Sequence, residues 1–378
     1  MKICILSYIY PVKENKTLGI FVHHQARELA KFNEVHVVTK YHKNMRGYEL
    51  VDGVKVHRVG NINFNFGVVK KMMSLNSKLN FDVIHAHFLG ISTLIQGITS
   101  KIIRVPFVVT LHGAEIFSKG IIKRFCLLFP KKVMCVSHYT ANLAKRLTDK
   151  NKISIVYNGI DTKRLRPTKS KKMFTKQIGL INKKIILSVG DLVKRKGFDT
   201  VIKALPSLIK LFPSLTYVII GRGPEKQNLI LQSKKLRIEK YIRYVDYVSD
   251  EELSNYYNAC DIFVLMSRTL TKERGVEGFG IVFIEAALFY KPVIAGKSGG
   301  TSDAVIDGVT GFLIDSTNIN ESQKKISLLL KNPGLGKKFG KNGRDRVVKN
   351  MLWKHNSQRT VRVYNDAIKS YNEKIQLH

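Results

Sequence analysis

The stretch GVEGFGIVFIEAALFYKPVIAGKSGGTSD, residues 275–303, places one glycine-rich turn before an apolar helical run and a second glycine pair after a short strand. The helical run covers residues 281–289 and the strand covers 292–295. Most helices that stand between two strands with glycines at their ends belong to an α/β scaffold and bind nothing. Two glycine turns that each precede a helix N-terminus can, however, present several backbone N–H groups to an anion.

Two glutamates lie eight residues apart in this stretch, Glu277 in the first glycine turn and Glu285 in the second turn of the predicted helix. A carboxylate among Ile, Phe and Ala is costly unless it has a partner. The spacing alone is too common to define a site. Together with the two glycine turns it favours an elongated ligand that reaches both carboxylates, such as two sugar rings joined by a diphosphate.

The segments EGFGIVFIEA (277–286) and GKSGGTSDAVIDGVTGFLI (296–314) resemble the donor-binding segment of the retaining glycosyltransferases of family 4. Within that family, the resemblance is to the phosphatidylinositol-mannosyltransferase and teichuronic-acid type. It implies an α/β protein with the GT-B fold, in which two doubly wound, Rossmann-like parallel-sheet domains face each other across a cleft. Further matching segments extend from residue 1 to the C-terminal helix.

The resemblance also implies a donor site within this stretch. Glu285 would bind the ribose hydroxyls of a nucleotide sugar, and Glu277 would engage hydroxyls of the transferred sugar as a catalytic residue. Backbone N–H groups at the two glycine turns would hold the diphosphate. The residues implied there are Gly280, Ile281, Val282, Gly299, Gly300 and Thr301.

The length of 378 residues exceeds what one hydrophobic core usually supports, about 250 to 300 residues, and so predicts two domains. We expect an acceptor-side domain over 1–162, a donor-binding domain over 163–353, and a helix over 354–378 that packs back on the first domain. Strand and helix patterns alternate, which favours mostly parallel sheets. Strands are predicted at 2–8, 34–39, 54–59, 81–87, 107–112, 132–138, 152–157, 184–190, 215–221, 242–247, 262–267, 292–295 and 311–315.

His112 directly follows the apolar residues 107–111, at the carboxyl edge of the predicted sheet, where ligands bind in such folds. The segment TLHGAE (110–115) resembles the family's T-x-H-G motif. This implies that His112 lies near the reaction centre and contacts the donor sugar, although not as a general base. His85 and His87 alternate along another strand, and the sequence leaves open whether they contact ligand or pack in the core.

Gly19 precedes a predicted helix that follows the first strand. This arrangement resembles the family's first turn, where a glycine-rich loop approaches the donor diphosphate. The family often has two adjacent glycines there, whereas this chain has one. A single glycine still permits close backbone approach, so a donor-binding role and a purely structural turn both remain open.

The segment DLVKRKGF (191–198) resembles the family's G-R-L-x-x-x-K-G loop, whose cations contact the donor diphosphate. Lys196 matches the family lysine and is assigned both a donor-binding and a catalytic role. Cations suit a departing diphosphate because they stabilise charge as it develops in the transition state. Asp191 stands where the family usually has arginine, and Arg195 is the candidate replacement.

The formal net charge is +36, and residues 101–200, with 23 basic and 5 acidic residues, carry half of this excess. Such a field favours anionic partners, namely nucleic acid, acidic lipid head groups or nucleotide diphosphates. A lysine-rich proteome would produce the same charge without selecting a partner. The sequence contains no recognisable nucleic-acid-binding motif, so nucleic acid is not expected as a partner.

Residues 119–132 combine an apolar run with basic ends. This pattern suits an anionic membrane surface, into which Ile, Phe and Leu insert while the cations meet the head groups. The same apolar residues could instead pack a helix on the sheet. The candidate membrane-facing residues are Lys119, Lys123, Arg124, Lys131 and Lys132.

The sequence contains no apolar run long enough to cross a bilayer, and MKICILSYIYP lacks a signal-peptide cleavage site. The four cysteines, which lack metal-like spacing, are Cys4, Cys126, Cys135 and Cys260. These features predict reduced core cysteines and a cytoplasmic protein, peripheral on the inner face of the cytoplasmic membrane. Because no D-x-D motif is present, we expect no metal and no cofactor besides the nucleotide-sugar co-substrate.

The combined interpretation is a retaining glycosyltransferase of the hexosyltransferase class. It would move a hexose or N-acetylhexosamine from a nucleotide-diphosphate sugar, UDP rather than GDP, to a glycan or lipid-linked acceptor in the synthesis of cell-surface polysaccharide or glycolipid. One alternative is a nucleotide-sugar epimerase on the same architecture, although we find no acid/base set for it. A second alternative, suggested only by charge, is a basic nucleic-acid-binding protein.

Overall fold

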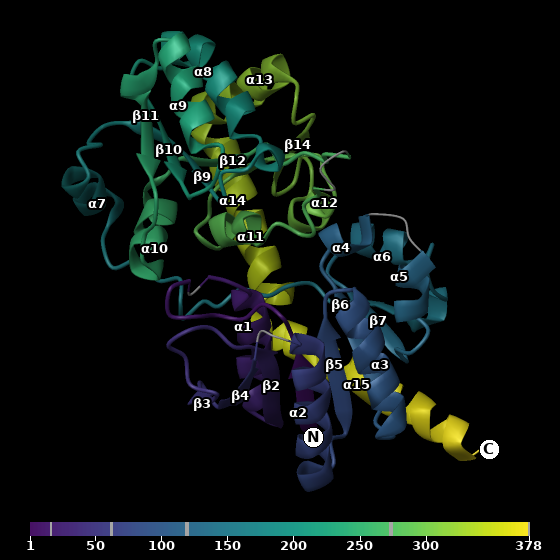
Figure 1. Ribbon diagram of the computed structural model, residues 1–378. Coiled ribbons are helices and arrows are strands. Elements are labelled where there is room, and N and C mark those ends of the chain that lie inside the picture. The colour runs from purple at the N-terminus through teal and green to yellow at the C-terminus, as the bar shows by residue number, and fades with distance from the viewer. Residues whose placement is uncertain (16, 61–62, 118–120, 272–274, 377–378) are drawn as a thin grey trace. The chain divides into compact units, whose positions relative to one another are not determined.

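The computed structural model of the protein describes residues 1–15, 17–60, 63–117, 121–271 and 275–376 (Figure 1). The chain forms two compact units. Unit 1 comprises Met1–Gly159 and Trp353–His378, and unit 2 comprises Ile160–Leu352. Each unit is an α/β structure built on one sheet.

The sheet of unit 1 has eight strands in the order β3-β4-β2-β1-β5-β6-β7-β8. Their bounds are β1 Lys2–Leu6, β2 Glu34–Lys40, β3 Tyr48–Val51, β4 Val54–Val59, β5 Val83–His87, β6 Phe107–Leu111, β7 Lys132–Cys135 and β8 Ile153–Ile155. All neighbouring strands are parallel except β3 and β4, which form an antiparallel hairpin. The β1, β2, β5 and β6 strands are almost wholly buried because helices cover both faces.

The edge strand β3 is absent from the sequence-based prediction. Its hairpin turn is Asp52-Gly53, and both residues have positive φ, 51° and 80°. An Asp-Gly pair between short strands is the residue pair that a two-residue hairpin turn requires. The signal was therefore present in the sequence, but the strand has only four residues and is too short to stand out.

Helices cover both faces of the unit 1 sheet, and their bounds are α1 Ile20–Ala30, α2 Phe64–Leu79, α3 Ile91–Ile102, α4 Ala114–Phe117, α5 Ile121–Cys126, α6 His138–Ala144 and α15 Trp353–Gln376, with a 3₁₀ turn η1 at Lys150–Lys152. On one face α1 packs against α15, and Val22, Leu29 and Tyr364 fill the core between these helices and the strands. On the other face α2 packs on α3, and α3 packs on α5. Figure 1 shows α2 and α3 side by side along the strands of unit 1.

The C-terminal helix α15 is an integral part of unit 1. A Cβ on Gly159 would lie 2.5 Å from the Trp353 backbone nitrogen, so only glycine fits where the helix begins. Asn356 Nδ2 donates to the carbonyl of Tyr157 at 2.7 Å. Further along, Tyr364 and Ala367 are fully buried. The helix thus completes the core of a domain whose other residues all lie before position 160.

The sheet of unit 2 has six parallel strands in the order β11-β10-β9-β12-β13-β14. Their bounds are β9 Lys184–Val189, β10 Leu215–Ile220, β11 Ile242–Val245, β12 Ile262–Leu265, β13 Val293–Gly296 and β14 Gly311–Ile314. The strands read as short runs of Val, Ile and Leu, as expected for a sheet covered on both faces. All six confirm strands predicted from the sequence.

The helices of unit 2 are α7 Lys171–Gln177, α8 Phe198–Leu211, α9 Lys226–Lys235, α10 Asp250–Ala259, α11 Ile281–Leu288, α12 Thr301–Ala304, α13 Ile319–Lys331 and α14 Pro333–Asn350, with 3₁₀ turns η2 Lys194–Lys196 and η3 Glu239–Tyr241. Helix α8 packs on α9 and α13, and α11 packs on α14. In Figure 1 the strands of unit 2 lie between these two groups.

Each sheet has one point at which the strand order reverses. In unit 1 the reversal lies between β1 and β5, and in unit 2 between β9 and β12. Loops at the carboxyl ends of such strands diverge and leave a crevice, which is where doubly wound sheets bind ligands. The loops that follow β1, β5, β9 and β12 are therefore the places to seek a site.

Two further features of the described residues bear on the sequence-based expectations. None of the helices in the described part of the chain is both long enough and apolar enough to span a membrane. The four cysteines Cys4, Cys126, Cys135 and Cys260 are all buried and free, which confirms that they are core residues rather than disulfide partners.

Candidate active site

In unit 2 three loops meet at Glu277, at the reversal of the strand order. Lys196, in the loop after β9, donates from Nζ to Glu277 Oε2 at 2.6 Å, and Arg195 approaches the same oxygen at 3.3 Å. Ser267, just after β12, donates to that oxygen at 3.3 Å. The turn before α12 lies on the backbone of Glu277, because the Gly300 N–H donates to its carbonyl at 2.8 Å. The structure thus brings together residues that are far apart in the chain.

The charges in this cluster are buried. Glu277 is 9% exposed and Lys196 is 7% exposed. Burial raises the pKa of Glu277, but the charges of Lys196 and Arg195 and the hydrogen bonds outweigh it, so the pKa lies below its ordinary value. The carboxylate is therefore ionised at neutral pH. Two cations then face one anion, which leaves one positive charge in excess beside the strand ends.

The side-chain hydrogen bonds of Glu277 within the described residues all fall on Oε2. Within the described residues, Oε1 makes no hydrogen bond and can accept one from a ligand hydroxyl. The cluster can therefore attract a diphosphate with its cations and orient a sugar with its free carboxylate oxygen.

The glycine turns have the shapes that the sequence predicts. Gly280 has φ 92° and precedes α11, and a Cβ there would lie 2.4 Å from the Phe283 ring. Gly299 has φ 54°, and a Cβ there would lie 2.2 Å from the carbonyl oxygen of Glu277. Neither position accepts a side chain without rearrangement. The backbone can approach a ligand closely at both turns.

The N–H groups of the two turns differ in availability. Ile281 and Val282 form the first turn of α11, where N–H groups have no intrahelical acceptor. In the second turn, the Gly300 N–H donates to Glu277 and the Thr301 N–H donates to the Ser298 carbonyl at 3.1 Å. Two of the N–H groups expected to hold a diphosphate are thus already paired within the protein.

Glu285 projects from α11 into a second polar cluster of unit 2. Its Oε1 accepts from Arg164 Nη2 at 2.5 Å, and its Oε2 accepts from the Tyr257 hydroxyl at 2.8 Å. Arg164 also contacts Asp250 at 2.6 Å. Sequence reasoning missed Arg164 and Tyr257. Arg164 lies in the basic segment KRLRPTKSKK (163–172), where one more cation does not stand out.

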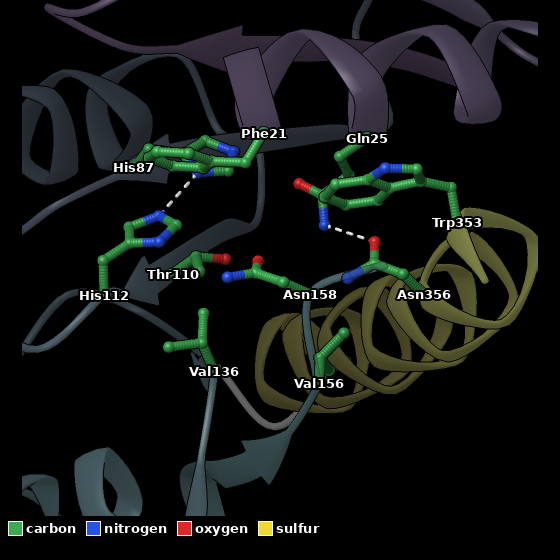
Figure 2. Close-up of a pocket in the computed structure, with 10 residues that line it drawn as sticks. All are labelled: Phe21, Gln25, His87, Thr110, His112, Val136, Val156, Asn158, Trp353 and Asn356. Carbon is green, nitrogen blue, oxygen red and sulfur yellow. Dashed lines mark hydrogen bonds between the residues drawn. The ribbon is translucent and has the colours of Figure 1, made fainter. Parts of the chain in front are cut away.

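In unit 1 His112 lies just past β6, at the carboxyl edge of the sheet (Figure 2). Its ring packs against both Phe21 and Phe88, with centroid distances of 4.7 and 4.6 Å. Its backbone N–H donates to the Glu115 carboxylate. Burial lowers the pKa of His112 to about 3, so the imidazole is neutral at physiological pH. A neutral ring suits a hydrogen bond to a sugar hydroxyl.

The two strand histidines of β5 have different surroundings. His85 is fully buried, and its ring nitrogens bond Tyr364 and Thr110, both at 2.7 Å. It is thus a satisfied core residue. His87 pairs with His112, with 3.0 Å between Nδ1 and Nε2. Phe88, the next residue, has φ 71°, an uncommon backbone conformation that turns the chain sharply beside His112.

Gly19 caps α1 with φ 61°, and a Cβ there would lie 2.7 Å from the Ile9 carbonyl oxygen. The turn therefore requires glycine for structural reasons alone.

In the loop of unit 2 that holds Lys196, Asp191 is exposed, whereas Arg195 and Lys196 both donate to Glu277. Arg195 thus stands beside the family lysine as a second cation.

The candidate membrane residues do not form one group. Lys123 and Arg124 lie on α5 among exposed apolar side chains, of which Ile121 is 71% exposed and Phe125 is 50% exposed. Lys131 lies over the Tyr371 ring at 5.2 Å. Lys132 begins β7 and donates to the Asn151 carbonyl at 3.2 Å. Lys119 lies outside the described residues.

Among the described residues, no three His, Cys, Asp or Glu side chains are placed to hold a metal ion together. The positive charges at the Glu277 cluster are those of the protein's own side chains.

Two models of known protein families match this chain, one in each half. The family model described as "Glycosyl transferases group 1" matches residues 171–346, and the one described as "Glycosyltransferase Family 4" matches residues 18–164. A GDP-mannose-dependent alpha-(1-6)-phosphatidylinositol monomannoside mannosyltransferase of Mycolicibacterium smegmatis is 32% identical over 197 residues. That alignment covers 52% of each chain, so this chain spans about half the length of that relative. An uncharacterised glycosyltransferase of Methanocaldococcus jannaschii is 27% identical and aligns over 91% of this chain and 93% of its own.

Two solved structures share the fold. Sucrose-phosphate synthase from Thermosynechococcus elongatus superposes with a TM-score of 0.78 at 19% identity, covering 98% of this chain and 99% of that one. HepE of Anabaena, solved in complex with UDP, gives a TM-score of 0.78 at 20% identity over 97% of this chain and 100% of its own. The chain belongs to glycosyltransferase family 4 and has the GT-B fold. It is a glycosyltransferase, which confirms the class implied by the sequence resemblance.

Proposed function

We propose that this glycosyltransferase is a retaining enzyme that moves a hexose or N-acetylhexosamine from a nucleotide-diphosphate sugar to a glycan or lipid-linked acceptor. The transfer would be a step in the synthesis of cell-surface polysaccharide or glycolipid. The observation that carries the proposal is the cluster of Lys196, Arg195 and Glu277, which lies at the strand reversal of unit 2 and next to the N-terminus of α11.

Each part of the cluster suits one part of the donor. Lys196 and Arg195 would neutralise the diphosphate, assisted by the N–H groups of Ile281 and Val282. Glu277 would accept from a hydroxyl of the transferred sugar through Oε1. Glu285, held by Arg164 and Tyr257, would accept from the ribose hydroxyls. Gly300 and Thr301 would shape the turn rather than bind phosphate, because their N–H groups are paired in the protein.

The relatives point to two candidate donor bases, uracil and guanine. The sequence-based interpretation named UDP ahead of GDP. Curated relatives that are 30% and 32% identical are named as GDP-mannose-dependent, whereas HepE was solved with UDP. We therefore take UDP-sugars and GDP-mannose as the two donor classes to compare.

In the proposed mechanism, the acceptor hydroxyl attacks the sugar from the same face from which the diphosphate leaves. A phosphate oxygen of the leaving group takes the proton of that hydroxyl. Stabilisation of charge on that phosphate then dominates the rate, and preorganised cations in a buried site supply it. Lys196 and Arg195 would serve this purpose without a metal ion. His112 would hydrogen-bond a hydroxyl of the transferred sugar.

We also propose that the protein is cytoplasmic and binds the anionic inner surface of the cytoplasmic membrane through unit 1. The supporting feature is α5, where Lys123 and Arg124 accompany exposed Ile121, Ile122 and Phe125. Helix α3, which packs on α5, adds exposed Ile91 and Ile98. Basic and apolar side chains on one surface suit an interface with acidic lipids.

Thermal unfolding of the full-length protein in EDTA tests the donor site. We expect one nucleoside diphosphate and its sugar conjugate, among UDP, GDP and ADP, to raise the melting temperature selectively. Lys196→Ala should abolish that shift, while Lys194→Ala, two residues away in the same turn, should retain it. Equal shifts with every polyanion, or a shift that survives Lys196→Ala, would contradict the site.

A further inference from the structure

His87 and His112 form a hydrogen-bonded pair at the carboxyl edge of unit 1, drawn with a dashed line in Figure 2. Their rings are stacked, with 5.3 Å between centroids and 20° between planes. A hydrogen bond between two neutral imidazoles needs one N–H and one lone pair. Only one of the two facing nitrogens, His87 Nδ1 or His112 Nε2, therefore carries a proton.

Two arrangements of protons are possible, and they give opposite properties to the two outer nitrogens. If His87 Nδ1 donates, His112 carries its own proton on Nδ1, and His87 Nε2 is a bare lone pair. If His112 Nε2 donates, His112 Nδ1 becomes an acceptor, and His87 Nε2 carries an N–H. The proton in the shared bond thus determines whether His112 offers a ligand a donor or an acceptor.

Burial of the outer nitrogen of His87 selects between the arrangements. His87 is 5% exposed, and within the described residues its Nε2 is buried without a hydrogen-bond partner. An orphaned buried N–H is rarer in proteins than an unfilled acceptor. The favoured arrangement leaves Nε2 as the lone pair and places the proton on His87 Nδ1. Burial also lowers the pKa of both rings and keeps them neutral.

The ring of His87 is held in place by its neighbours. His85 lies against it with 4.4 Å between centroids. His85 is itself fixed by the Tyr364 hydroxyl at Nδ1 and by Thr110 at Nε2, both at 2.7 Å. On the far side of the pair, His112 Nδ1 has no hydrogen-bond partner within the described residues. That nitrogen is the one available to a ligand.

We propose that His87 is a positioning residue that holds His112 in its Nδ1–H tautomer, so that His112 presents an N–H donor to a substrate oxygen. The tautomer follows from this structure alone. The identity of the oxygen, a hydroxyl of the transferred sugar, rests on the proposed function.

Histidine tautomers are visible in long-range ¹H–¹⁵N spectra, which test the proposal without any activity measurement. The full-length protein would be labelled with ¹⁵N-histidine and studied at pH 7.5, with His112→Gln used to assign the signals. We expect His112 to be protonated at Nδ1 and bare at Nε2. A wild-type spectrum with the proton on His112 Nε2 would overturn the proposal.

Two variants separate the hydrogen bond from the packing of the ring. Asn at position 87 can place an amide N–H near the position of Nδ1, whereas Leu fills the space without a donor. We expect His87→Asn to keep the Nδ1–H tautomer of His112 and His87→Leu to lose it. An unchanged tautomer in a folded His87→Leu protein would overturn the proposal, and if that variant fails to fold, the wild-type spectrum still decides.

Steady-state kinetics with the donor identified by thermal unfolding add the functional readout. The loss of one oriented hydrogen bond in His87→Leu should lower kcat about tenfold with little change in the donor KM, and His87→Asn should recover most of it. Equal losses in the two variants would show that His87 serves only to pack. If the wild-type protein transfers no sugar, the proposed function fails, while the spectra still report on the tautomer.

Discussion

At the scale of single residues, we expect the Glu277 cluster to bind the diphosphate with its cations and to orient the sugar with its carboxylate. Substitutions can separate these two roles. Glu277→Gln keeps the volume of the side chain but removes its charge, so Lys196 and Arg195 gain a stronger net field. We expect nucleoside diphosphate binding to persist or tighten while turnover falls roughly a hundredfold or more. Lys196→Ala should lower both turnover and diphosphate binding, with turnover falling by a similar factor.

Isothermal titration with the nucleoside diphosphate and initial rates with the nucleotide sugar would check this pair, with Lys194→Ala as the matched control. A Glu277→Gln enzyme with normal turnover would exclude a role for that carboxylate in the transition state. Because Lys196 and Glu277 are a buried pair, unfolding curves must accompany the rates. Removing one partner of such a pair can cost about 3 to 5 kcal/mol of stability.

Arg164 gives a second prediction at this scale. It holds Glu285 from one side while Tyr257 holds it from the other. Arg164→Ala should weaken binding of the nucleoside diphosphate by about tenfold, because Glu285 loses the contact that orients it. The same variant should lose preference for the diphosphate over its 2′,3′-dideoxy form. Comparable discrimination in wild type and variant would show that Glu285 does not read the ribose hydroxyls.

The sequence could predict these site residues only in part. Turns that need glycine, and charged residues that stand in apolar runs, are visible in a single sequence because they break a local pattern. The family resemblance added their roles. Partners such as Arg164, Tyr257 and Ser267 look ordinary in their own segments. They become identifiable only when folding places them against Glu277 or Glu285.

At the scale of elements, the charges of α5 can be removed while its exposed apolar side chains are kept. Lys123→Ala with Arg124→Ala should reduce sedimentation with anionic vesicles severalfold, because each cation near an acidic surface contributes about 1 kcal/mol. Donor binding in unit 2 should not change. The matched control is Lys234→Ala with Lys235→Ala, which removes the same charge from the end of α9 in unit 2. If both double variants lose vesicle binding equally, net charge alone explains the effect. If neither loses it, α5 is not the membrane-binding surface.

Most elements were predictable because parallel strands covered on both faces read as continuous apolar runs. All six strands of unit 2 and seven of the eight in unit 1 lie within predicted ranges or close to them. The exception, β3, is an edge strand of four residues, none of them buried, and is too short to form a recognisable pattern. The apolar run at 119–132 spans more than one element, because α5 ends at Cys126 and Lys132 begins β7, where the strand over 132–138 was predicted.

At the scale of the whole molecule, buried neutral histidines make stability depend on pH. Burial lowers the pKa of His85 and His112 to about 3 and that of His57 to about 4, from an ordinary value of 6.5. Below pH 6.5 these histidines therefore bind protons in the unfolded chain but stay neutral in the folded chain. Stability should be complete above that pH and fall as the pH drops from 6.5 towards 4, by up to about 1.4 kcal/mol per pH unit for each such histidine.

Urea unfolding at pH 7.5, 6.0 and 5.0, followed through probes in each unit, would measure this dependence. We expect unit 1, which holds all three of these histidines, to lose stability first. His57→Phe should make the dependence shallower. A free energy of unfolding that stays constant from pH 7.5 to 5.0 would contradict the assignment of these rings as neutral.

The C-terminal helix has a consequence for the order in which the protein is made. Tyr364 and Ala367 complete the core of unit 1, yet the ribosome synthesises all of unit 2 before it reaches them. At a synthesis rate of about 5 to 20 residues per second, the apolar sheet face around Val108 and Met134 stays uncovered for roughly 10 to 40 s before α15 is made. Unit 2, an uninterrupted segment, can fold during that interval. Nascent unit 1 is then the natural client of chaperones, and ribosome stalling within unit 2 would expose it for longest.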